Sequence, residues 1–408
     1  MTHFNSPLES FLHWEKETPN DIFLNQPING IYNSYTFKDV GVQARKVAHH
    51  LKRYELPEKS HIALLSKNCA HWIIADLAIM MAGYVTIPLY PTLNSKSIHQ
   101  LLEHSESRAI IIGKLDNYSS QKSGIENIPK ISIDLYGESD GDLWSEIMKE
   151  HHLLADLHQQ DKDDLITIIY TSGTTGSPKG VMHTVGNFME SSYALINEYP
   201  IPKKPDLFSY LPLAHVAERV GVSVLGLILG AKISFAESLD TFATNLEDTQ
   251  PDIFFAVPRI WTKFQDKILE NIPQRRLNII LSIPFLNEIF KNKLKKKLGL
   301  ANAKLVVSAA APLAISAMIW YKKLGIEILQ LYGMTEDCVI SHGNRPGENK
   351  IGTVGKAHAS VSAKLSEAGE ILIKNNCLMK GYFKEPDLTN QSFTHDGYLK
   401  TGDVGEYD

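Results

Sequence analysis

The sequence predicts an α/β fold built mostly of parallel strands. Short apolar runs typical of buried strands alternate along the chain with segments whose apolar residues recur at helical spacing. With 408 residues, 43% of them hydrophobic and 21% charged, the chain has a globular composition and exceeds the length that one compact core usually supports. We therefore expect two or three subdomains.

The first α/β series is expected in residues 1–164. Its predicted elements are a strand in 61–67, a helix in 70–81, a strand in 84–90, a helix in 95–105 and a strand in 108–113. The longest apolar stretch, from Trp72 to Tyr90, is interrupted by an aspartate, a glycine and a proline, which favours a buried helix and strand over a membrane span. The stretch 113–164 is rich in Ser, Asp, Gly and Lys, and we expect it to cover the surface.

A second α/β series is expected in residues 165–345. Apolar strands are predicted in 165–171, 206–213, 252–258, 304–311 and 327–333, with a helix in 185–196. From about Ile351 the pattern changes to short alternating segments separated by glycine, which predicts a small antiparallel sheet or barrel in residues 346–408.

Charge and cysteine content exclude several classes of protein. A formal net charge of −5 argues against a nucleic-acid-binding protein, which usually carries a strongly basic domain. The three cysteines lie far apart and show neither metal-binding spacing nor a disulfide framework. The N-terminus lacks a basic segment followed by an apolar run, so we expect no signal peptide and a cytoplasmic location.

The most informative segment is Tyr170–Val181, which follows an apolar strand and precedes the helix expected from residue 185. Its glycines let backbone N–H groups approach an anion, its hydroxyl side chains add donors, and Lys179 adds a positive charge. The pattern is not a Walker A loop, because Lys179 is followed by Gly180 rather than by Ser or Thr. A polar surface turn would be the ordinary interpretation of a shorter run, whereas twelve such residues after a buried strand indicate a triphosphate site.

This segment resembles the signature loop of the acyl-adenylate-forming superfamily, the AMP-binding enzymes, which includes acyl-CoA synthetases, firefly-type luciferases and the adenylation domains of peptide synthetases. Further segments similar to those of the family follow in the expected order: Leu211–Arg219, Val257–Lys263, Ser308–Leu313, Leu331–Asp337 and Asp396–Asp408. The resemblance extends from about Tyr35 to the end of the chain. It implies the large N-terminal domain of these enzymes, with two α/β subdomains and a small β-barrel-like subdomain.

The resemblance also implies a nucleotide site. The residues expected to bind the nucleotide are Thr171, Ser172, Gly173, Thr174, Thr175, Gly176, Lys179, Ala310, Ala311, Pro312, Tyr332, Gly333, Met334, Thr335 and Asp403. By resemblance Tyr332 stacks on the adenine, small residues of 310–312 lie along it, and Asp403 accepts hydrogen bonds from the two ribose hydroxyls. A carboxylate has the two acceptor oxygens that a vicinal diol needs.

Catalysis and substrate binding are assigned in the same way. The residues expected to take part in catalysis are Thr174, Lys179, His215 and Glu336, and those expected to hold Mg²⁺ are Thr175 and Glu336. The residues expected to line a fatty-acid tunnel are His215, Val220 and Trp261. A structural histidine and a core tryptophan are the ordinary alternatives for His215 and Trp261, so both assignments depend on the order of the family segments.

The segments at 211–219, 257–261 and 332–336 look most like those of long- or very-long-chain acyl-CoA synthetases. They imply ATP-dependent activation of a long-chain fatty acid to an acyl-adenylate with release of pyrophosphate, followed in the full-length enzyme by transfer to coenzyme A. Two alternatives stay open: a fatty acyl-AMP ligase that delivers to a carrier protein, and a non-catalytic nucleotide- or lipid-binding module. One departure from the family is Asn375–Asn376, where many members carry Arg-Gly.

Family members continue beyond the position of Asp408 with a hinge and a smaller C-terminal domain that supplies a lysine to the reaction. We therefore expect ATP–Mg²⁺ binding by this chain but little overall activity. Acyl chain length and oligomeric state are left open, a homodimer being one option for the latter.

The segment Phe285–Leu300 has the pattern of a basic amphipathic helix. Phe290, Leu294 and Leu298 recur at four-residue spacing and five lysines occupy the other faces. Peripheral contact of this helix with an anionic membrane is one interpretation, and packing of its apolar face on the domain is the other, which we favour.

Overall fold

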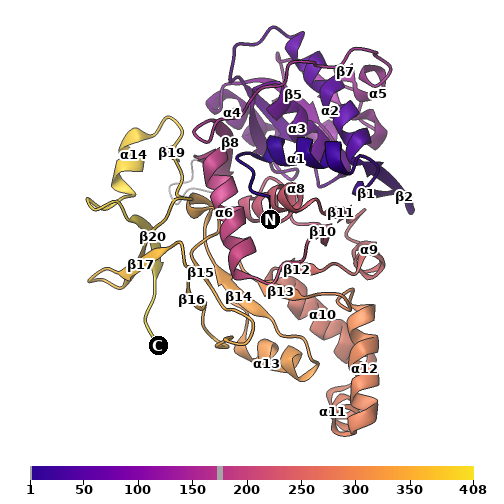
Figure 1. The fold of residues 1–408 in the computed structure, drawn as a ribbon, viewed down its shortest axis with the longest axis vertical. Helices are drawn as coiled ribbons and strands as arrows, with labels where there is room; N and C mark the ends of the chain where they lie inside the picture. Colours follow the sequence, from indigo (N-terminus) through magenta and orange to yellow (C-terminus); the bar gives the residue numbers. More distant parts are fainter. Residues whose placement is uncertain (1, 172–177) are drawn as a thin grey trace.

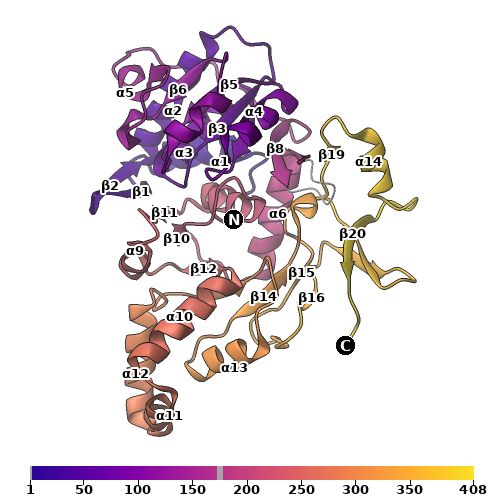
Figure 2. The same ribbon diagram turned by 180° about the vertical axis from the view of Figure 1, so that it is seen from behind.

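A computed structural model describes residues 2–171 and 178–408. The described strands form sheets of eight, nine and three strands, and most neighbouring strands of the two large sheets run parallel. The eight-stranded sheet and its helices form one end of the molecule, and the nine-stranded sheet extends from there towards the other end (Figures 1 and 2). The predicted α/β fold is confirmed.

The eight-stranded sheet has the order β19-β9-β8-β4-β3-β5-β6-β7. Its strands are β3 (His61–Leu65), β4 (Val85–Leu89), β5 (Ser107–Ile112), β6 (Lys130–Ser132), β7 (Asp142–Leu143), β8 (Leu165–Thr171), β9 (Lys179–Thr184) and β19 (Gly381–Tyr382). The strands expected in 61–67, 84–90 and 108–113 are thus confirmed. The stretch 113–164 is more than a surface cover, because it adds β6 and β7 to the sheet and buries Ile131, Ile133 and Trp144 in the core.

The nine-stranded sheet has the order β16-β15-β14-β13-β12-β10-β11-β1-β2. Its strands are β1 (Ile22–Ile28), β2 (Ile31–Thr36), β10 (Asp206–Ser209), β11 (Lys232–Phe235), β12 (Ile253–Ala256), β13 (Leu305–Ser308), β14 (Leu329–Tyr332), β15 (His342–Gly343) and β16 (Lys356–Ala357). The first strand of the chain lies parallel to β11, with Leu24 opposite Ile233.

The third sheet is antiparallel and consists of β17 (Ser362–Leu365), β18 (Glu370–Lys374) and β20 (Leu399–Val404). It confirms the antiparallel structure expected after residue 346. Strands from both sides of residue 164 share the eight-stranded sheet, and β19 joins that sheet from the far end of the chain. The division into 1–164, 165–345 and 346–408 therefore stays a proposal.

The helices cover the faces of the two large sheets. The longer ones are α1 (Pro7–Glu17), α2 (Phe37–Lys52), α3 (Ala70–Met81), α4 (Ser95–His104), α6 (Val185–Glu198), α9 (Phe242–Thr249), α10 (Pro258–Asn271), α11 (Gln274–Ser282), α12 (Pro284–Lys297) and α13 (Ile315–Lys323). The shorter ones are α5 (Trp144–Ile147), α7 (Val216–Glu218), the π-helix η4 (Arg219–Val224), α8 (Leu225–Leu229), α14 (Pro386–Gln391) and the 3₁₀ turns η1 (Tyr118–Ser120), η2 (Lys122–Gly124), η3 (Asp134–Tyr136) and η5 (Thr335–Asp337).

Local capping sets the start of α6, the helix that packs beside the candidate site. The Thr184 side chain accepts a hydrogen bond from the backbone N–H of Asn187, and the Asn187 side chain accepts one from the N–H of Thr184. This capping box satisfies two backbone donors at the point where β9 ends, so strand and helix follow one another without a loop.

A buried ion pair joins the two large sheets. Arg219, at the start of η4, is fully buried and donates to Asp76 Oδ1 of α3 at 2.6 Å and to Thr167 Oγ1 of β8 at 2.5 Å. Its guanidinium also lies 5.5 Å from the ring centre of Trp72 and 5.6 Å from that of Phe188 on α6. One cation therefore connects α3, β8, η4 and α6.

Helix α12 does not present the apolar face expected for membrane contact. Phe290, Leu294 and Leu298 are partly buried and pack against the core beneath α10 and α13, as the packing interpretation predicted. Among residues 2–171 and 178–408, the helices are all too short or too polar to cross a bilayer.

We predict that Asp76→Ala lowers the free energy of unfolding by about 3–5 kcal/mol, because it leaves the buried Arg219 guanidinium without its counter-charge. Urea unfolding followed by circular dichroism measures the change. The matched control is Asp396→Ala, which breaks a 2.6 Å pair with Lys364 at the surface and should have a far smaller effect. Equal effects of the two substitutions would contradict the prediction.

Candidate functional site

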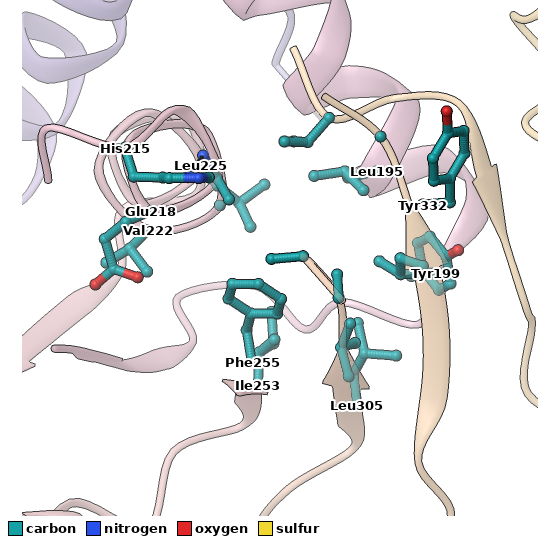
Figure 3. Close-up of a pocket in the computed structure, with 18 of the residues that line it drawn as sticks. Leu195, Tyr199, His215, Glu218, Val222, Leu225, Ile253, Phe255, Leu305 and Tyr332 are labelled. Carbon is teal, nitrogen blue, oxygen red and sulfur yellow. Dashed lines mark hydrogen bonds between the residues drawn. The ribbon is translucent and has the colours of Figure 1, made fainter. Parts of the chain in front are cut away.

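A cavity of about 410 Å³ lies between helix α6, the π-helix η4 and one face of the nine-stranded sheet. Figure 3 shows His215, Glu218 and Val222 on one side of the cavity and Tyr199 and Tyr332 on the other. Its volume falls in the range of small-molecule sites, which are mostly apolar with a few polar groups.

The lining of this cavity combines two kinds of residue. Residues predicted to bind the nucleotide or take part in catalysis contribute to it: Thr171, His215, Ala310, Tyr332, Gly333, Met334, Thr335 and Glu336. Tyr199 and a set of apolar side chains also line it, among them Leu195, Ile201, Ile253 and Leu305. The structure therefore brings most of the described nucleotide-binding candidates next to a deep apolar pocket.

The hydroxyl of Tyr332 donates a hydrogen bond to Asp403 Oδ2 at 2.7 Å. Tyr332 ends β14 and Asp403 lies in β20, so two residues predicted for the adenine and the ribose come from different sheets and meet here. Burial and the Asp403 carboxylate raise the pKa of the Tyr332 phenol above its ordinary value, so the phenol stays a donor at neutral pH. Asp403 itself is exposed and its carboxylate is open to a ligand.

Glu336, in the turn η5, is held by Tyr382 of β19. The Tyr382 hydroxyl donates to Glu336 Oε1 at 2.7 Å, and the Lys179 ammonium lies 5.5 Å from the Tyr382 ring centre. Tyr382 thus connects a predicted phosphate-binding cation with a predicted magnesium ligand. The sequence did not reveal this role, because Tyr382 reaches Glu336 through long-range contacts: β19 pairs with β9, and the Met379 N–H donates to the Glu336 carbonyl.

His183 of β9 contacts the turn η5. It is fully buried, and burial lowers its pKa to about 4, so the ring is neutral at pH 7. Its Nε2 lies 2.8 Å from the Thr335 carbonyl and must carry the hydrogen, which leaves Nδ1 to accept from the Cys338 thiol at 3.2 Å. Cys338 adopts a left-handed φ of 53°, so the chain turns sharply directly after η5.

His215 lines the cavity and caps the short helix α7. Its Nδ1 accepts a hydrogen bond from the Ala217 N–H at 3.1 Å, which leaves Nε2 with the hydrogen. Burial lowers the pKa of His215, so the ring is a neutral donor rather than a cation.

Glu218 also lines the cavity, and sequence analysis did not assign it a role. Its Oε1 accepts from Ser209 Oγ at 2.8 Å, from the Tyr210 N–H at 2.9 Å and from Asn68 Nδ2 at 3.3 Å. Burial raises the pKa of Glu218 to about 8, so this carboxyl is mostly protonated at pH 7. A protonated acid adds no negative charge to the wall beside a bound carboxylate.

The expected role of Trp261 in a fatty-acid tunnel is not met by this geometry. Trp261 is fully buried in α10 on the opposite face of the sheet, where it packs against Phe254 and Tyr321 and donates from Nε1 to the Ala256 carbonyl at 3.2 Å. The amphipathic pattern of α10 turns this side chain toward the sheet. In this structure Trp261 is a core side chain that does not line the cavity, and its role in a fatty-acid tunnel stays a prediction.

Val220, the other residue predicted for the tunnel, does not line the cavity either. It packs into the core beside Val185 and Phe188 of α6, whereas its neighbours Gly221 and Val222 line the cavity. An added Cβ at Gly221 would meet no atom within 4 Å, so a side chain at this position would enter open space.

The remaining predicted residues lie outside the cavity wall or outside the described residues. Ala311 and Pro312 are exposed in the turn after β13, next to Ala310, whose φ is 69°. The predicted Ser172, Gly173, Thr174, Thr175 and Gly176 fall in the segment 172–177, which is not described.

The described residues include no cluster of three or more His, Cys, Asp or Glu side chains that could hold a metal ion by itself. Mg²⁺ in nucleotide sites usually takes one or two carboxylates together with phosphate oxygens and water. Glu336 offers one such carboxylate at the cavity, so the residues present fit a magnesium ion that arrives with a nucleotide.

The sequence of the chain is similar to those of known enzymes. A sequence model described as AMP-binding enzyme matches residues 11–383. The chain is 26% identical over 444 residues to the long-chain-fatty-acid–CoA ligase FadD15 of Mycobacterium bovis, a match that covers 100% of this chain and 73% of that protein. It is 31% identical over 275 residues to fadD11 of Mycobacterium tuberculosis, covering 60% of this chain and 48% of that protein. The matched part thus spans about half of fadD11 and about three quarters of FadD15.

Solved structures show the same fold. The inhibitor-bound N-terminal domain of FACL13 from Mycobacterium tuberculosis matches with a TM-score of 0.80 at 20% identity, covering 99% of this chain and 97% of that one. The anthranilate CoA ligase AuaEII in complex with anthranoyl-AMP matches with a TM-score of 0.81 at 19% identity, covering 100% of this chain and 76% of that one.

We predict that the free energy of unfolding falls between about pH 5 and pH 8 partly because of Glu218. The unfolded chain loses this proton near the ordinary glutamate value, whereas the folded protein keeps it up to about pH 8. The contribution has an upper limit of about 1.4 kcal/mol per pH unit in this window. Urea unfolding at several pH values measures it.

The variant Glu218→Gln should show a flatter pH profile, because an amide does not titrate. Burial also raises the pKa of Asp337, to about 7. Its contribution to the pH dependence of the free energy of unfolding is the same in both proteins and cancels in the comparison. Parallel profiles for the two proteins would show that Glu218 is ionised in the fold.

Proposed function

The chain belongs to the AMP-binding enzyme family, and on that premise we propose that it activates a long-chain fatty acid as an acyl-adenylate, with ATP as co-substrate and pyrophosphate as the second product. The observation that supports this proposal most strongly is the cavity described above. Its wall combines Tyr332, Thr335 and Glu336 with a set of apolar side chains. A molecule that combines AMP with an alkyl chain matches both parts of this lining.

In the proposed complex the adenine stacks on Tyr332 beside the turn 310–312, and Asp403 accepts hydrogen bonds from the ribose hydroxyls. Lys179 contacts the phosphates, together with Thr174 and Thr175 of the undescribed segment. Mg²⁺, when bound to Glu336 and the phosphates, would neutralise negative charge on the triphosphate.

In the proposed reaction a carboxylate oxygen forms a bond to the α-phosphorus of ATP and the bond to pyrophosphate breaks. Negative charge on the α-phosphoryl oxygens is the main obstacle, so cations and neutral donors around the cavity favour the reaction. His215 fits as a neutral donor to the fatty carboxylate. Protonated Glu218 fits because a charged form would repel that carboxylate.

The acceptor and the location are further parts of the proposal. FadD15 is named as a CoA ligase, and we propose coenzyme A as the acceptor of the acyl group in the whole protein. Because the matched part spans only 48–73% of these relatives, the transfer step belongs to the proposal for the whole protein. We also propose a cytoplasmic location, with access to fatty acids at the membrane surface.

We predict that the chain binds a non-hydrolysable acyl-AMP analogue with a long alkyl chain much more tightly than AMP. Each methylene buried against the apolar side chains of the cavity should add about a fourfold gain in affinity until the cavity is full. Isothermal titration calorimetry measures this without a complete catalytic cycle. Affinity equal to that of AMP at every chain length would refute a fatty acid as the substrate and favour a nucleotide-binding module.

We predict that Tyr199 and Gly343 limit the length of the acyl chain. Tyr199 lines the cavity, and a Cβ added at Gly343 would lie 2.1 Å from the Tyr199 hydroxyl oxygen and 2.7 Å from Leu331 Cδ2. Gly343→Ala should therefore push both side chains into the cavity and shift the optimum to shorter analogues. Tyr199→Ala should shift the optimum to longer ones.

The control for this pair is Tyr199→Phe, which removes only a hydroxyl that lacks a hydrogen-bond partner among the described residues. Its chain-length profile should match that of the unaltered protein. If both Gly343→Ala and Tyr199→Ala keep the original optimum, the alkyl chain ends elsewhere.

A further inference from the structure

Residues 379–383 connect the segment that carries Lys179 with the segment that carries Glu336. Strand β19 pairs with β9, the strand that begins at Lys179. In addition, the Met379 N–H donates to the backbone carbonyl of Glu336 in η5 at 2.7 Å. This short connection therefore fixes the predicted phosphate-binding cation relative to the predicted magnesium ligand, although the two lie far apart in the sequence.

The side chain of Tyr382, in the middle of this connection, contacts both charged groups. Its hydroxyl donates to Glu336 Oε1 at 2.7 Å, and its ring centre lies 5.5 Å from the Lys179 ammonium. The side chain is buried, and the Tyr382 backbone N–H donates to Thr389 Oγ1 of α14 at 2.9 Å. The residue is thus held from outside the cavity, while its hydroxyl contacts the carboxylate and its ring contacts the cation.

These contacts leave both charged groups able to bind a ligand. In the part of the chain that the structure describes, Tyr382 is the one residue that donates to the Glu336 carboxylate, and it uses only one of the two oxygens. The second oxygen is left for a metal ion. Lys179 faces an aromatic ring, which attracts an ammonium less strongly than a carboxylate does, so it can turn to a phosphate.

The ring also affects how Lys179 and Glu336 act on one another. Opposite charges attract, and among the described contacts the two residues form no ion pair with each other. Without the ring they could approach to the distance of an ion pair. Lys179 would then no longer face phosphates, and Glu336 would no longer face a metal ion.

We propose that Tyr382 is a positioning residue for phosphate and magnesium binding: its hydroxyl orients Glu336, and its ring keeps Lys179 from pairing with Glu336. A hydrogen bond to a metal-binding carboxylate typically contributes about 10–100-fold to metal affinity, because it fixes the orientation of the ligand. This inference rests on the proposed function, since it requires that ATP and Mg²⁺ bind at the cavity.

The first test is the Mg²⁺ dependence of binding of α,β-methylene-ATP, which cannot be cleaved at the bond to pyrophosphate, measured by isothermal titration calorimetry. Tyr382→Phe keeps the ring and removes the hydroxyl. The Mg²⁺ concentration at half-maximal gain in affinity should therefore rise by about tenfold or more. Affinity for AMP without Mg²⁺ should stay unchanged, because AMP lacks the phosphates that bring the metal ion.

The second test is Tyr382→Leu, which removes the ring as well. Affinity for the same analogue in the presence of EDTA should fall by up to about fivefold, because the freed Lys179 pairs with Glu336 instead of a phosphate. Adding Glu336→Gln to Tyr382→Leu should restore this metal-free affinity, because an amide offers no charge to Lys179. Such recovery is not expected from a general loss of structure.

The matched control is Tyr118→Phe. The Tyr118 hydroxyl donates to the Asp140 carboxylate, also at 2.7 Å, and its side chain is as well buried as that of Tyr382, but it lies outside the cavity. This variant should show the same Mg²⁺ dependence as the unaltered protein. Circular dichroism verifies that each variant is folded.

Two results would overturn this inference while leaving the proposed function intact. One is a Tyr382→Phe protein with the Mg²⁺ dependence of the unaltered protein. The other is an equal loss of affinity for AMP and for the ATP analogue in that variant, which would show a purely structural role. If the unaltered protein binds the ATP analogue at no Mg²⁺ concentration, the proposed function itself fails, and the role of Tyr382 fails with it.

Discussion

The arrangement of the elements around the cavity depends on one fully buried cation, the Arg219 guanidinium. This guanidinium donates to Asp76 of helix α3 and to Thr167 of strand β8. Removing a charge from water costs several kcal/mol unless its partners are in place. The pair thus permits essentially one way of placing η4 against α3 and β8, and η4 forms one wall of the cavity.

The segment around Arg219 contributes side chains both to the core and to the wall of the cavity. Within the few residues from His215 to Val222, His215, Glu218 and Val222 face the cavity, whereas Arg219 and Val220 face the core. A π-helical turn has a wider spacing than an α-helix and changes which residues share a face. Helical spacing alone does not show that Val220 faces the core while Gly221 and Val222 line the cavity.

Much of the fold could be predicted because it depends on local pattern. Apolar runs gave β3, β4 and β5, and helical spacing gave α4 and α6. Long-range pairing could not be predicted in this way: β1 lies beside β11, and Tyr382 reaches Glu336 across 46 positions.

The site also has a part that could be predicted and a part that could not. Tyr332 and Glu336 belong to a segment that the sequence makes recognisable, whereas the pKa of Glu218 depends on burial by residues from several elements. The core position of Trp261 could not be predicted, because a sequence does not show which face of a sheet a helix covers.

The bond between Tyr332 and Asp403 has a consequence for the thermodynamics of ligand binding. Each side chain fixes the rotamer of the other in the free protein, across two sheets that are distant in sequence. Ordering a mobile side chain at a binding site costs about 0.5–1.5 kcal/mol of conformational entropy. Here that entropy is already lost when the chain folds, so a ligand that contacts this pair meets a preorganised surface and a smaller entropic penalty.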